Sequence, residues 1–355
     1  MSLTVDIEKK LDNFRLQVSF EAGDGVTSIL GASGCGKSMT LRCIAGVATP
    51  DRGRIVLDGR VLFDSEKGIN IPPQKRNTGF LFQNYALFPN MTVRENILTS
   101  VRGGHGAAEK RRITDEVIER LHLTDVSDLL SSEISGGQMQ RTALARIMVN
   151  GAEIILLDEP FSALDEHLRF AVENELYGIM KEFRRPVILV SHSRDEVYRL
   201  SDRVAVMNGG IIENSGPVRE VFRNPRTVYG ARLTGVKNIA PATVEGGRML
   251  HAPAWGISRE LPENTDVSGI TAAGIRMNDL RAERPDGVSG RFYDFDIVSV
   301  TENLFSRMVE LRAAGSGNPA PLYWQVAGDG LHYDVRKRIS LFVPDDAVMP
   351  LRGKI

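Results

Sequence analysis

A glycine-rich stretch near the N-terminus has the residue types that bind phosphate. It reads Gly31-Ala32-Ser33-Gly34-Cys35-Gly36-Lys37-Ser38 and fits the pattern G-x-x-x-x-G-K-[ST]. Glycines let successive backbone N–H groups point at one anion, and a helix that begins there adds its positive dipole end. We expect Lys37 to reach the β- and γ-phosphates of a nucleotide and the Ser38 hydroxyl to bind Mg²⁺. The alternative is a chance glycine-rich turn, which a flanking strand over residues 26–30 and a helix over 39–45 argue against.

Two adjacent carboxylates end an apolar strand over residues 154–159. Asp158 can anchor Mg²⁺, usually through water, and Glu159 is placed to polarise an attacking water. A carboxylate pair at a strand end is commonplace by itself. In a chain that also has a phosphate loop, the catalytic interpretation is favoured.

A second helix start is also suited to an anion. Ser135, Gly136, Gly137 and Gln138 precede a predicted helix and offer backbone N–H groups and a hydroxyl. One chain has one γ-phosphate to hold, so we expect a head-to-tail dimer in which each chain presents this loop to its partner's nucleotide. The alternative is a simple serine N-cap.

Two further polar residues each follow a predicted buried strand. The imidazole of His192 could contact the γ-phosphate, and the amide of Gln83 could bind Mg²⁺ or position water. A lone histidine at a strand end is usually structural. A functional role for His192 and Gln83 is therefore supported only by the other motifs in the chain.

Strands and helices alternate over the first two thirds of the chain. This alternation predicts a mostly parallel α/β sheet with ligands at the carboxyl ends of its strands. Residues 84–150 have a helical pattern and form an insertion between core strands. The dipeptide Asp58-Gly59 predicts a hairpin within residues 54–63. Further strands are expected at residues 4–8, 14–20, 78–82, 186–190, 204–207 and 211–213.

The pattern changes after about residue 226. Glycine and proline become more frequent, and short alternating runs appear at residues 307–312, 322–326 and 339–343. We interpret residues 235–355 as a small all-β domain, a barrel.

Composition sets limits on the remaining possibilities. The chain has 355 residues, 42% of them hydrophobic and 25% charged, and a net charge of −1, so a polyanion-binding surface is not indicated. No apolar run is long enough to cross a bilayer, and the N-terminus lacks signal-peptide features. Two cysteines, Cys35 and Cys43, fit a reducing compartment, and we expect a cytoplasmic protein. A helix start can lower the pKa of a thiol, but we favour Cys35 as a small residue tolerated in the loop.

Together these motifs resemble, in order and spacing, those of ABC-transporter ATPases. The Walker A, Q-loop, signature, Walker B, D-loop and H-loop motifs correspond to Gly31–Ser38, Gln83, Ser135–Gln138, residues 154–159, Ser162–Asp165 and His192. The resemblance implies a P-loop (RecA-like) nucleotide-binding domain at residues 1–232 with a helical subdomain at 84–150, followed by an OB/MOP/TOBE-like regulatory β-barrel at 235–355. It also implies hydrolysis of ATP with Mg²⁺ at two sites shared by a homodimer, with Asp165 among the nucleotide-binding residues.

The family resemblance implies partners as well. Residues 83–89 would help to receive a coupling helix of an integral membrane permease, which itself takes cargo from a periplasmic or extracellular substrate-binding protein. The chain would then lie peripherally on the cytoplasmic face of the inner membrane, without nucleic acid as a partner.

One cassette followed by a β domain is similar to the import subfamily. Residues 53–97 resemble the ATP-binding subunits of molybdate importers. Sulfate, ferric iron, polyamine or sugar are alternative cargoes, and a soluble ABC ATPase acting on nucleic acid is an alternative of another class. Three departures stand out: Ile134 replaces the common leucine of the signature motif, no aromatic is clearly placed to stack on adenine, and residues 236–238 match the oxyanion motif of molybdate-binding domains only in part. Phe14 is the nearest candidate for stacking on adenine, and packing in the core is the alternative for it.

Overall fold

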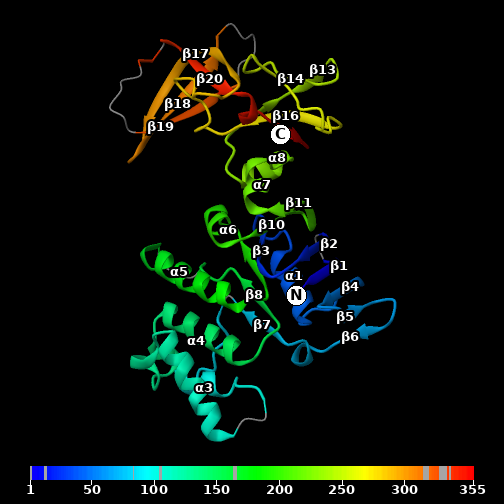
Figure 1. Cartoon of the computed structure of the whole chain (residues 1–355), viewed down its shortest axis with the longest axis vertical. Helices are drawn as coiled ribbons and strands as arrows, with labels where there is room; N and C mark the ends of the chain where they lie inside the picture. Colours follow the sequence, from blue (N-terminus) through cyan, green and yellow to red (C-terminus); the bar gives the residue numbers. More distant parts are fainter. Residues whose placement is uncertain are drawn as a thin grey trace. The chain divides into compact units, whose positions relative to one another are not determined.

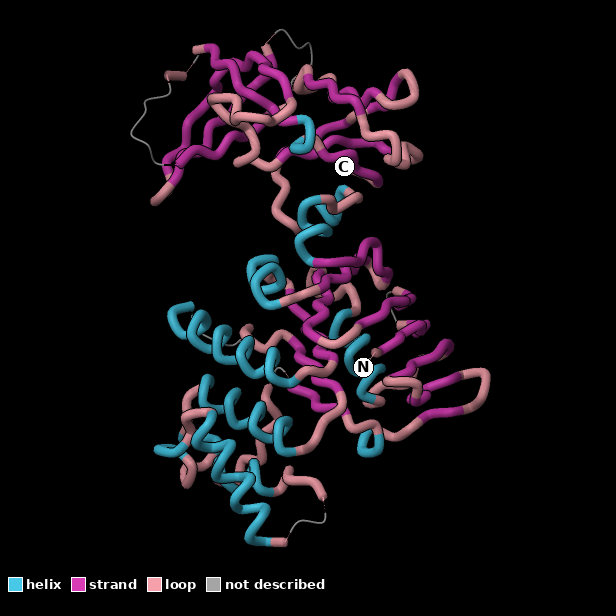
Figure 2. The backbone as a smooth tube through the Cα atoms, viewed as in Figure 1, coloured by secondary structure: helices cyan, strands magenta, loops and turns pink. Residues whose placement is uncertain are grey.

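The computed structural model describes residues 2–11, 14–82, 84–103, 106–162, 166–314, 320–327, 334–335 and 337–355. The chain divides into two compact units, Met1–Arg219 and Glu220–Ile355 (Figure 1). Helices and strands alternate in the first unit, whereas strands dominate the second (Figure 2). The domain limits drawn from the sequence, 1–232 and 235–355, stay a prediction.

The first unit is built on one sheet of eleven strands. The strands are β1 (Leu3–Lys10), β2 (Arg15–Ala22), β3 (Gly25–Leu30), β4 (Arg52–Leu57), β5 (Arg60–Asp64), β6 (Ile69–Asn70), β7 (Thr78–Leu81), β8 (Ile154–Asp158), β9 (Pro186–Ser191), β10 (Arg203–Asn208) and β11 (Ile211–Pro217). Their spatial order is β6-β5-β4-β1-β2-β11-β10-β3-β9-β8-β7.

This sheet is mixed, so the expectation of a mostly parallel sheet was wrong. The strands β10, β3, β9, β8 and β7 pair in parallel, as helical crossovers require. Antiparallel pairs form among β1, β2, β4, β5 and β6. Short connections join β1 to β2 and β4 to β5, and such connections are possible only between antiparallel strands. The predicted hairpin turn is confirmed: Asp58 and Gly59 have φ angles of 49° and 77°, which suit a tight two-residue turn.

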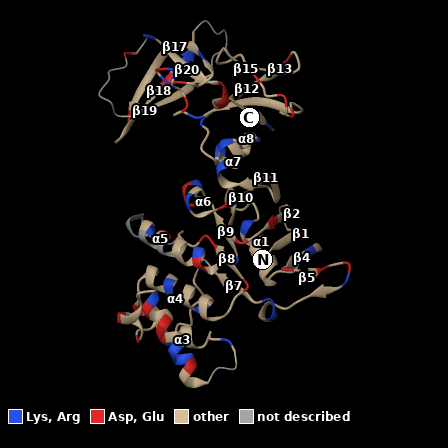
Figure 3. Ribbon diagram, in the orientation of Figure 1, with Lys and Arg blue, Asp and Glu red and all other residues tan. Residues whose placement is uncertain are grey.

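Helices cover this sheet and form the insertion after β7. In the first unit they are α1 (Lys37–Ala45), α2 (Val93–Leu98), α3 (Ala107–Arg120), α4 (Gly136–Val149), α5 (Glu166–Phe183) and α6 (Arg194–Leu200), with η1 (Pro73–Lys75), η2 (Thr124–Val126) and η3 (Ser131–Glu133) as short 3₁₀ turns. The helices α2, α3 and α4 confirm the helical character predicted for residues 84–150. Charges of both signs lie along α3 (Figure 3), where Arg112 pairs with Glu109 and Glu116. No helix in the described part of the chain is long and apolar enough to cross a membrane.

The helix of the phosphate loop is held in place by a buried arginine. Arg76 has no exposed surface and donates hydrogen bonds to the carbonyls of Cys43 (2.9 Å) and Ile44 (2.8 Å) at the end of α1. Burial lowers the pKa of Arg76. At Gly46, which ends α1 with a φ of 79°, an added Cβ would lie 2.5 Å from the Arg76 Nε. The cation therefore satisfies carbonyls at the negative end of the helix dipole.

The second unit confirms the expected small all-β domain. After α7 (Val218–Arg223), whose residues span the boundary between the units in the sequence, and α8 (Val228–Leu233), the strands form three sheets. The main apolar core includes Trp255, Phe295 and Leu341, and a smaller apolar cluster includes Val228 and Leu351. The strands are β12 (Asn238–Pro241), β13 (Thr243–Glu245), β14 (Met249–Ala252), β15 (Ile257–Glu260), β16 (Ile270–Ile275), β17 (Gly290–Glu302), β18 (Ser306–Ala313), β19 (Leu322–Ala327), β20 (Arg338–Pro344) and β21 (Met349–Arg352), with η4 (Asp345–Ala347) before the last.

Candidate active site

The glycine-rich loop joins β3, which lies between β10 and β9 in the sheet, to α1. At Gly31 an added Cβ would lie 2.5 Å from the carbonyl oxygen of Met207, so only glycine fits. Gly34 and Gly36 have φ angles of 80° and 111°, a region that glycine adopts without strain. The backbone therefore curls at the start of α1, which is the geometry of an anion-binding loop.

Lys37 folds back over this loop. Its side chain is 4% exposed, and its Nζ donates to the carbonyl oxygens of Gly31 (2.9 Å) and Ala32 (3.0 Å). The same Nζ lies 3.8 Å from the Oε1 of Glu159. The ammonium group is thus fixed inside the loop and faces the carboxylate at the end of β8.

Ser38 and Asp158 form an oxygen pair suited to a divalent cation. The Ser38 hydroxyl donates to the Asp158 carboxylate at 2.7 Å. Burial raises the pKa of Asp158, the hydrogen bond from Ser38 acts in the opposite direction, and the neighbouring Glu159 raises it further. A carboxylate that is desolvated in this way gains from a bound cation, and hydroxyl and carboxylate oxygens are ligands that Mg²⁺ prefers. The residues present therefore fit Mg²⁺.

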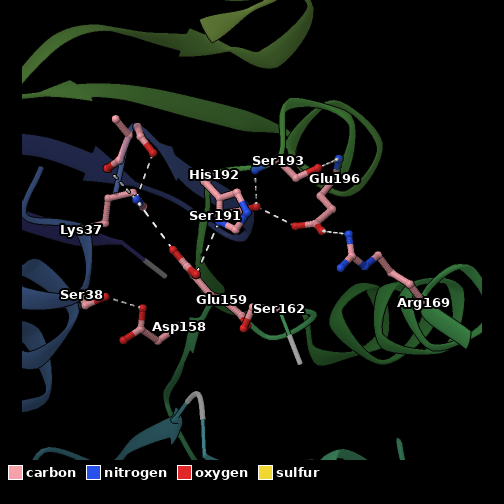
Figure 4. A network of polar contacts seen from close by, with 12 residues as sticks. Lys37, Ser38, Asp158, Glu159, Ser162, Arg169, Ser191, His192, Ser193 and Glu196 are labelled. Carbon is pink, nitrogen blue, oxygen red and sulfur yellow. Dashed lines mark hydrogen bonds and ion pairs between the residues drawn. The ribbon is translucent and has the colours of Figure 1, made fainter. Parts of the chain in front are cut away.

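Glu159 lies between Lys37 and His192. Its Oε2 is 3.4 Å from the His192 Nδ1, and Figure 4 shows the carboxylate reaching toward both partners. The backbone of Glu159 has a φ of 47°, uncommon for a residue other than glycine, and its N–H donates to the carbonyl oxygen of Val190 on β9 at 3.0 Å. The neighbouring strands β8 and β9 thus bring the two side chains together at their carboxyl ends.

The second predicted anion site, at Ser135–Gln138, makes its hydrogen bonds within the start of α4. Ser135 caps α4: its backbone N–H donates to the Gln138 Oε1 at 2.8 Å, and the Gln138 N–H donates to the Ser135 hydroxyl at 3.4 Å. Gly136 and Gly137 form the first turn of this helix. Among the described residues, no hydrogen bond or ion pair joins Ser135 or Gln138 to Lys37. Within one chain, the hydrogen bonds of Ser135 and Gln138 are therefore those of a helix N-cap, the alternative drawn from the sequence.

Three other predicted positions complete the comparison with the sequence. Gln83 and Asp165 lie outside the described residues. Cys35 is 7% exposed and burial raises the pKa of its thiol, with Lys37 acting in the opposite direction. The raised pKa and the burial of Cys35 agree with a small buried residue in the loop.

The structure also describes the surroundings of Phe14 and of Asn238, which belongs to the partial oxyanion motif at residues 236–238. The Phe14 ring is partly buried against the core, and an added Cβ at Gly36 would lie 3.3 Å from it, so the ring borders the phosphate loop. In the second unit the Asn238 side chain is 1% exposed and makes hydrogen bonds of 2.7 and 2.8 Å with the backbone N–H and carbonyl of Tyr323. The amide of Asn238 is therefore occupied by a backbone partner.

Sequence reasoning missed the residues that support His192. The Ser191 hydroxyl donates to the Glu196 Oε2 at 2.6 Å, and both side chains are buried. The pattern Ser193-x-x-Glu196 at the start of α6 is a capping-box signal that could have drawn attention to this turn. Arg76 offers no comparable signal, because nothing local in the sequence marks it as buried.

Comparisons with known proteins agree with this geometry. The family model described as ABC transporter matches residues 14–162. The chain is 35% identical over 335 residues to the molybdenum import ATP-binding protein ModC of Rhodospirillum rubrum, covering 91% of this chain and 89% of that protein. It is 37% identical over 357 residues to the spermidine/putrescine import ATP-binding protein PotA of Nitrosospira multiformis, covering 95% of this chain and 93% of that protein.

A solved structure gives the same result for the fold. It is described as a dimeric post-hydrolysis state of the ATP-binding cassette MJ0796 bound to ADP and Pi, and it matches 62% of this chain and 99% of its own with a TM-score of 0.52 and 26% identity. The family resemblance and the fold class inferred from the sequence are therefore confirmed. The chain is an ATPase of the ABC transporter family.

Proposed function

We propose that this ATPase powers import through a membrane permease and that its cargo is an oxyanion, molybdate. The observation that carries the ATPase part is the cluster of Lys37, Ser38, Asp158, Glu159 and His192 around the glycine loop. Support for the cargo comes from the molybdenum importer among the relatives and from the resemblance of residues 53–97. A polyamine is the second candidate, because the similarity to the spermidine/putrescine import protein covers 95% of this chain.

Each residue of the cluster has a proposed role. Lys37 and the amides of the loop stabilise negative charge on the transferred phosphoryl group. Mg²⁺, when bound, neutralises phosphate charge, and Ser38, Asp158 and Gln83 would hold it. Glu159 polarises the attacking water, with Gln83 helping to position it, and His192 contacts the γ-phosphate. The position of Glu159 beside both Lys37 and His192 supports this assignment.

We propose a homodimer that encloses two ATP molecules. Ser135, Gly136, Gly137 and Gln138 of one chain would complete the site of the other, together with Asp165. Ser135 is exposed at the start of α4, which leaves its hydroxyl accessible to a second chain. Closure around ATP would move the docked permease, and hydrolysis with phosphate release would reopen the dimer.

The permease would dock beside the residues that follow β7. A cavity of about 240 Å³ lies there, lined by Phe80, Phe82, Tyr85, Ala86 and Arg146 among others. Arg146 donates to the Ala86 carbonyl at 2.6 Å and lies over the Phe88 ring. A hollow lined by aromatic and polar side chains, with the Arg146 cation beside it, suits a short helix of a permease. A substrate-binding protein would act through that permease, nucleic acid would not be a partner, and the chain would be peripheral on the cytoplasmic face of the inner membrane.

The substitution Glu159→Gln tests the catalytic assignment. It removes the carboxylate that would polarise water but keeps the size of the side chain, so we expect ATP binding to remain while turnover falls roughly 100-fold or more. The variant should also accumulate as an ATP-bound dimer in size-exclusion chromatography. Glu153→Gln is the matched control, since Glu153 lies beside the opposite end of β8 and pairs with Arg60. A Glu159→Gln enzyme with wild-type turnover would contradict the assignment.

The cargo is tested with the permease that co-purifies with this chain. The complex is reconstituted in liposomes, and ATP hydrolysis is measured with substrate-binding proteins loaded with molybdate, sulfate, spermidine or a sugar. Stimulation by the molybdate-loaded protein supports the proposal. A response only to the spermidine-loaded protein would establish the second candidate instead.

A further inference from the structure

The turn that carries His192 is fixed by a buried hydrogen-bond network rather than by His192 itself. The His192 side chain is 56% exposed, whereas Ser191 before it is 2% exposed. The Ser191 hydroxyl accepts from the Ser193 N–H at 2.9 Å and donates to the Glu196 Oε2 at 2.6 Å. The backbone on both sides of His192 is thus tied to one carboxylate.

Glu196 also connects this turn to a second helix. Its side chain is 9% exposed, and its Oε1 lies 3.9 Å from the Arg169 guanidinium on α5. Figure 4 shows the line of contacts from Ser191, which precedes His192 in the chain, through Glu196 to Arg169. The Glu196 N–H donates to the Ser193 hydroxyl at 3.4 Å, so the same residue closes the first turn of α6. Because α5 follows the segment after Glu159, Glu196 joins the two chain segments that carry the facing catalytic groups.

We propose that Glu196 is a positioning residue for hydrolysis, which holds His192 in contact with Glu159 by bonding Ser191 and pairing with Arg169. A carboxylate is required because a single side chain must accept from a hydroxyl with one oxygen and face a cation with the other. Loss of this residue releases the turn around His192 and leaves the phosphate loop unchanged. This inference rests on the proposed catalytic role of His192.

The substitution Glu196→Ala separates turnover from nucleotide binding. We expect kcat to fall roughly 10- to 100-fold, because a displacement of about 1 Å at a catalytic group has effects of this size. Binding of a fluorescent ATP analogue should fall much less than kcat, since Lys37 and Ser38 are untouched and the contact of His192 with the γ-phosphate alone is weakened. Glu196→Gln retains an acceptor for Ser191 and should recover part of kcat. A parallel loss of binding and kcat would overturn the proposal.

Combination with His192→Ala identifies the residue through which Glu196 acts. Single-turnover hydrolysis with excess enzyme is measured for each variant and for the double variant. If Glu196 acts through His192, the double variant should be no slower than His192→Ala alone. An additive loss would overturn the proposal. Wild-type turnover in His192→Ala would instead refute the catalytic role of His192, so the two failures are distinguishable.

NMR of the imidazole groups gives a readout that a general loss of stability does not produce. With ¹⁵N-histidine labelling, the His192 signal is assigned by its absence from His192→Ala, and it should shift in Glu196→Ala. Asp64→Asn is the matched control, because Asp64 is a buried carboxylate of β5 that accepts from the backbone N–H groups of Glu66 and Lys67. The control should lower Tm without moving the His192 signal. A shift of equal size in both variants would overturn the proposal.

Discussion

The two units of this chain differ in what they bury. Among the described residues, the buried charged residues all belong to the first unit, and these residues are Lys37, Asp64, Arg76, Asp158, Glu173 and Glu196. In the described part of the second unit, the buried polar residues are Thr234 and Asn238, and both are uncharged. Charges are costly to bury unless they are paired or hydrogen-bonded. The first unit therefore bears this cost at buried sites, whereas Arg259 and Asp279 of the second unit, whose pKa values burial also shifts, stay partly exposed.

The partners of these charges separate two uses of burial. Arg76 donates to backbone carbonyls at the end of α1, so its charge is satisfied by structure. Asp158 has the Ser38 hydroxyl as its bonded side-chain partner and a raised pKa, so its site would be better satisfied by a cation. The buried charges are thus of two kinds. Those like Arg76 stabilise the fold through partners in the chain itself, and those like Asp158 are suited to bind a ligand.

The largest effect is expected from loss of a charge that holds the fold. Arg76→Ala removes the donor to the carbonyls of Cys43, Ile44 and Ile71 and leaves them buried. We expect the free energy of unfolding to fall by about 3–5 kcal/mol, the range for breaking a buried charged network. Chemical denaturation measures this change, with Arg52→Ala at an exposed site as the control. A loss no larger than that of the control would show that buried charge in this unit does not stabilise it.

Loss of a buried charge that is suited to bind a ligand should lower ATP turnover and ATP affinity. Lys37→Ala should lower ATP turnover roughly 100- to 1,000-fold, because its ammonium is fixed to stabilise phosphate charge. ATP affinity should also fall, as measured by calorimetry. The control is Lys237→Ala, an exposed lysine of the second unit. Unchanged ATP affinity in Lys37→Ala would contradict the role of the phosphate loop.

The difference between local patterns and tertiary contacts explains which features could be predicted from the sequence. The phosphate loop, the carboxylates after β8 and the helix after Ser135 follow from local patterns, because the loop needs glycine and strands and helices have their own periods. Apart from the hairpin at residues 54–63, the antiparallel half of the sheet was not foreseen, since the other strand pairs depend on contacts between segments that lie further apart in the sequence. Burial of Arg76 depends on tertiary packing, which no local pattern encodes. The capping-box pattern of Ser193 and Glu196 marks the turn after His192, but it does not reveal the buried bond from Ser191 to Glu196.

A polar residue of the second unit should affect stability alone. Asn238→Ala breaks the two hydrogen bonds to the Tyr323 backbone, and leaving those groups buried costs about 1–3 kcal/mol. Hydrogen exchange of the Tyr323 amide should become faster, while ATP turnover stays within about twofold of wild type. Asn303→Ala, at an exposed position, is the control. A large fall in turnover would show that the second unit contributes to the active site.

The smallest effect is a gain in stability from removing a catalytic charge. Because burial raises the pKa of Asp158, the folded chain holds this proton more tightly than the unfolded chain, and stability without ligand falls as pH rises from the ordinary pKa through the raised one. At neutral pH the penalty of the desolvated carboxylate remains, and Asp158→Asn removes it while keeping an acceptor for Ser38. We expect Tm without ligand to rise by about 2–4 °C. Addition of Mg²⁺ and ATP should reverse the order, since wild type gains stability from binding and the variant gains less. A variant less stable than wild type without ligand would show that this charge holds the fold, as Arg76 does.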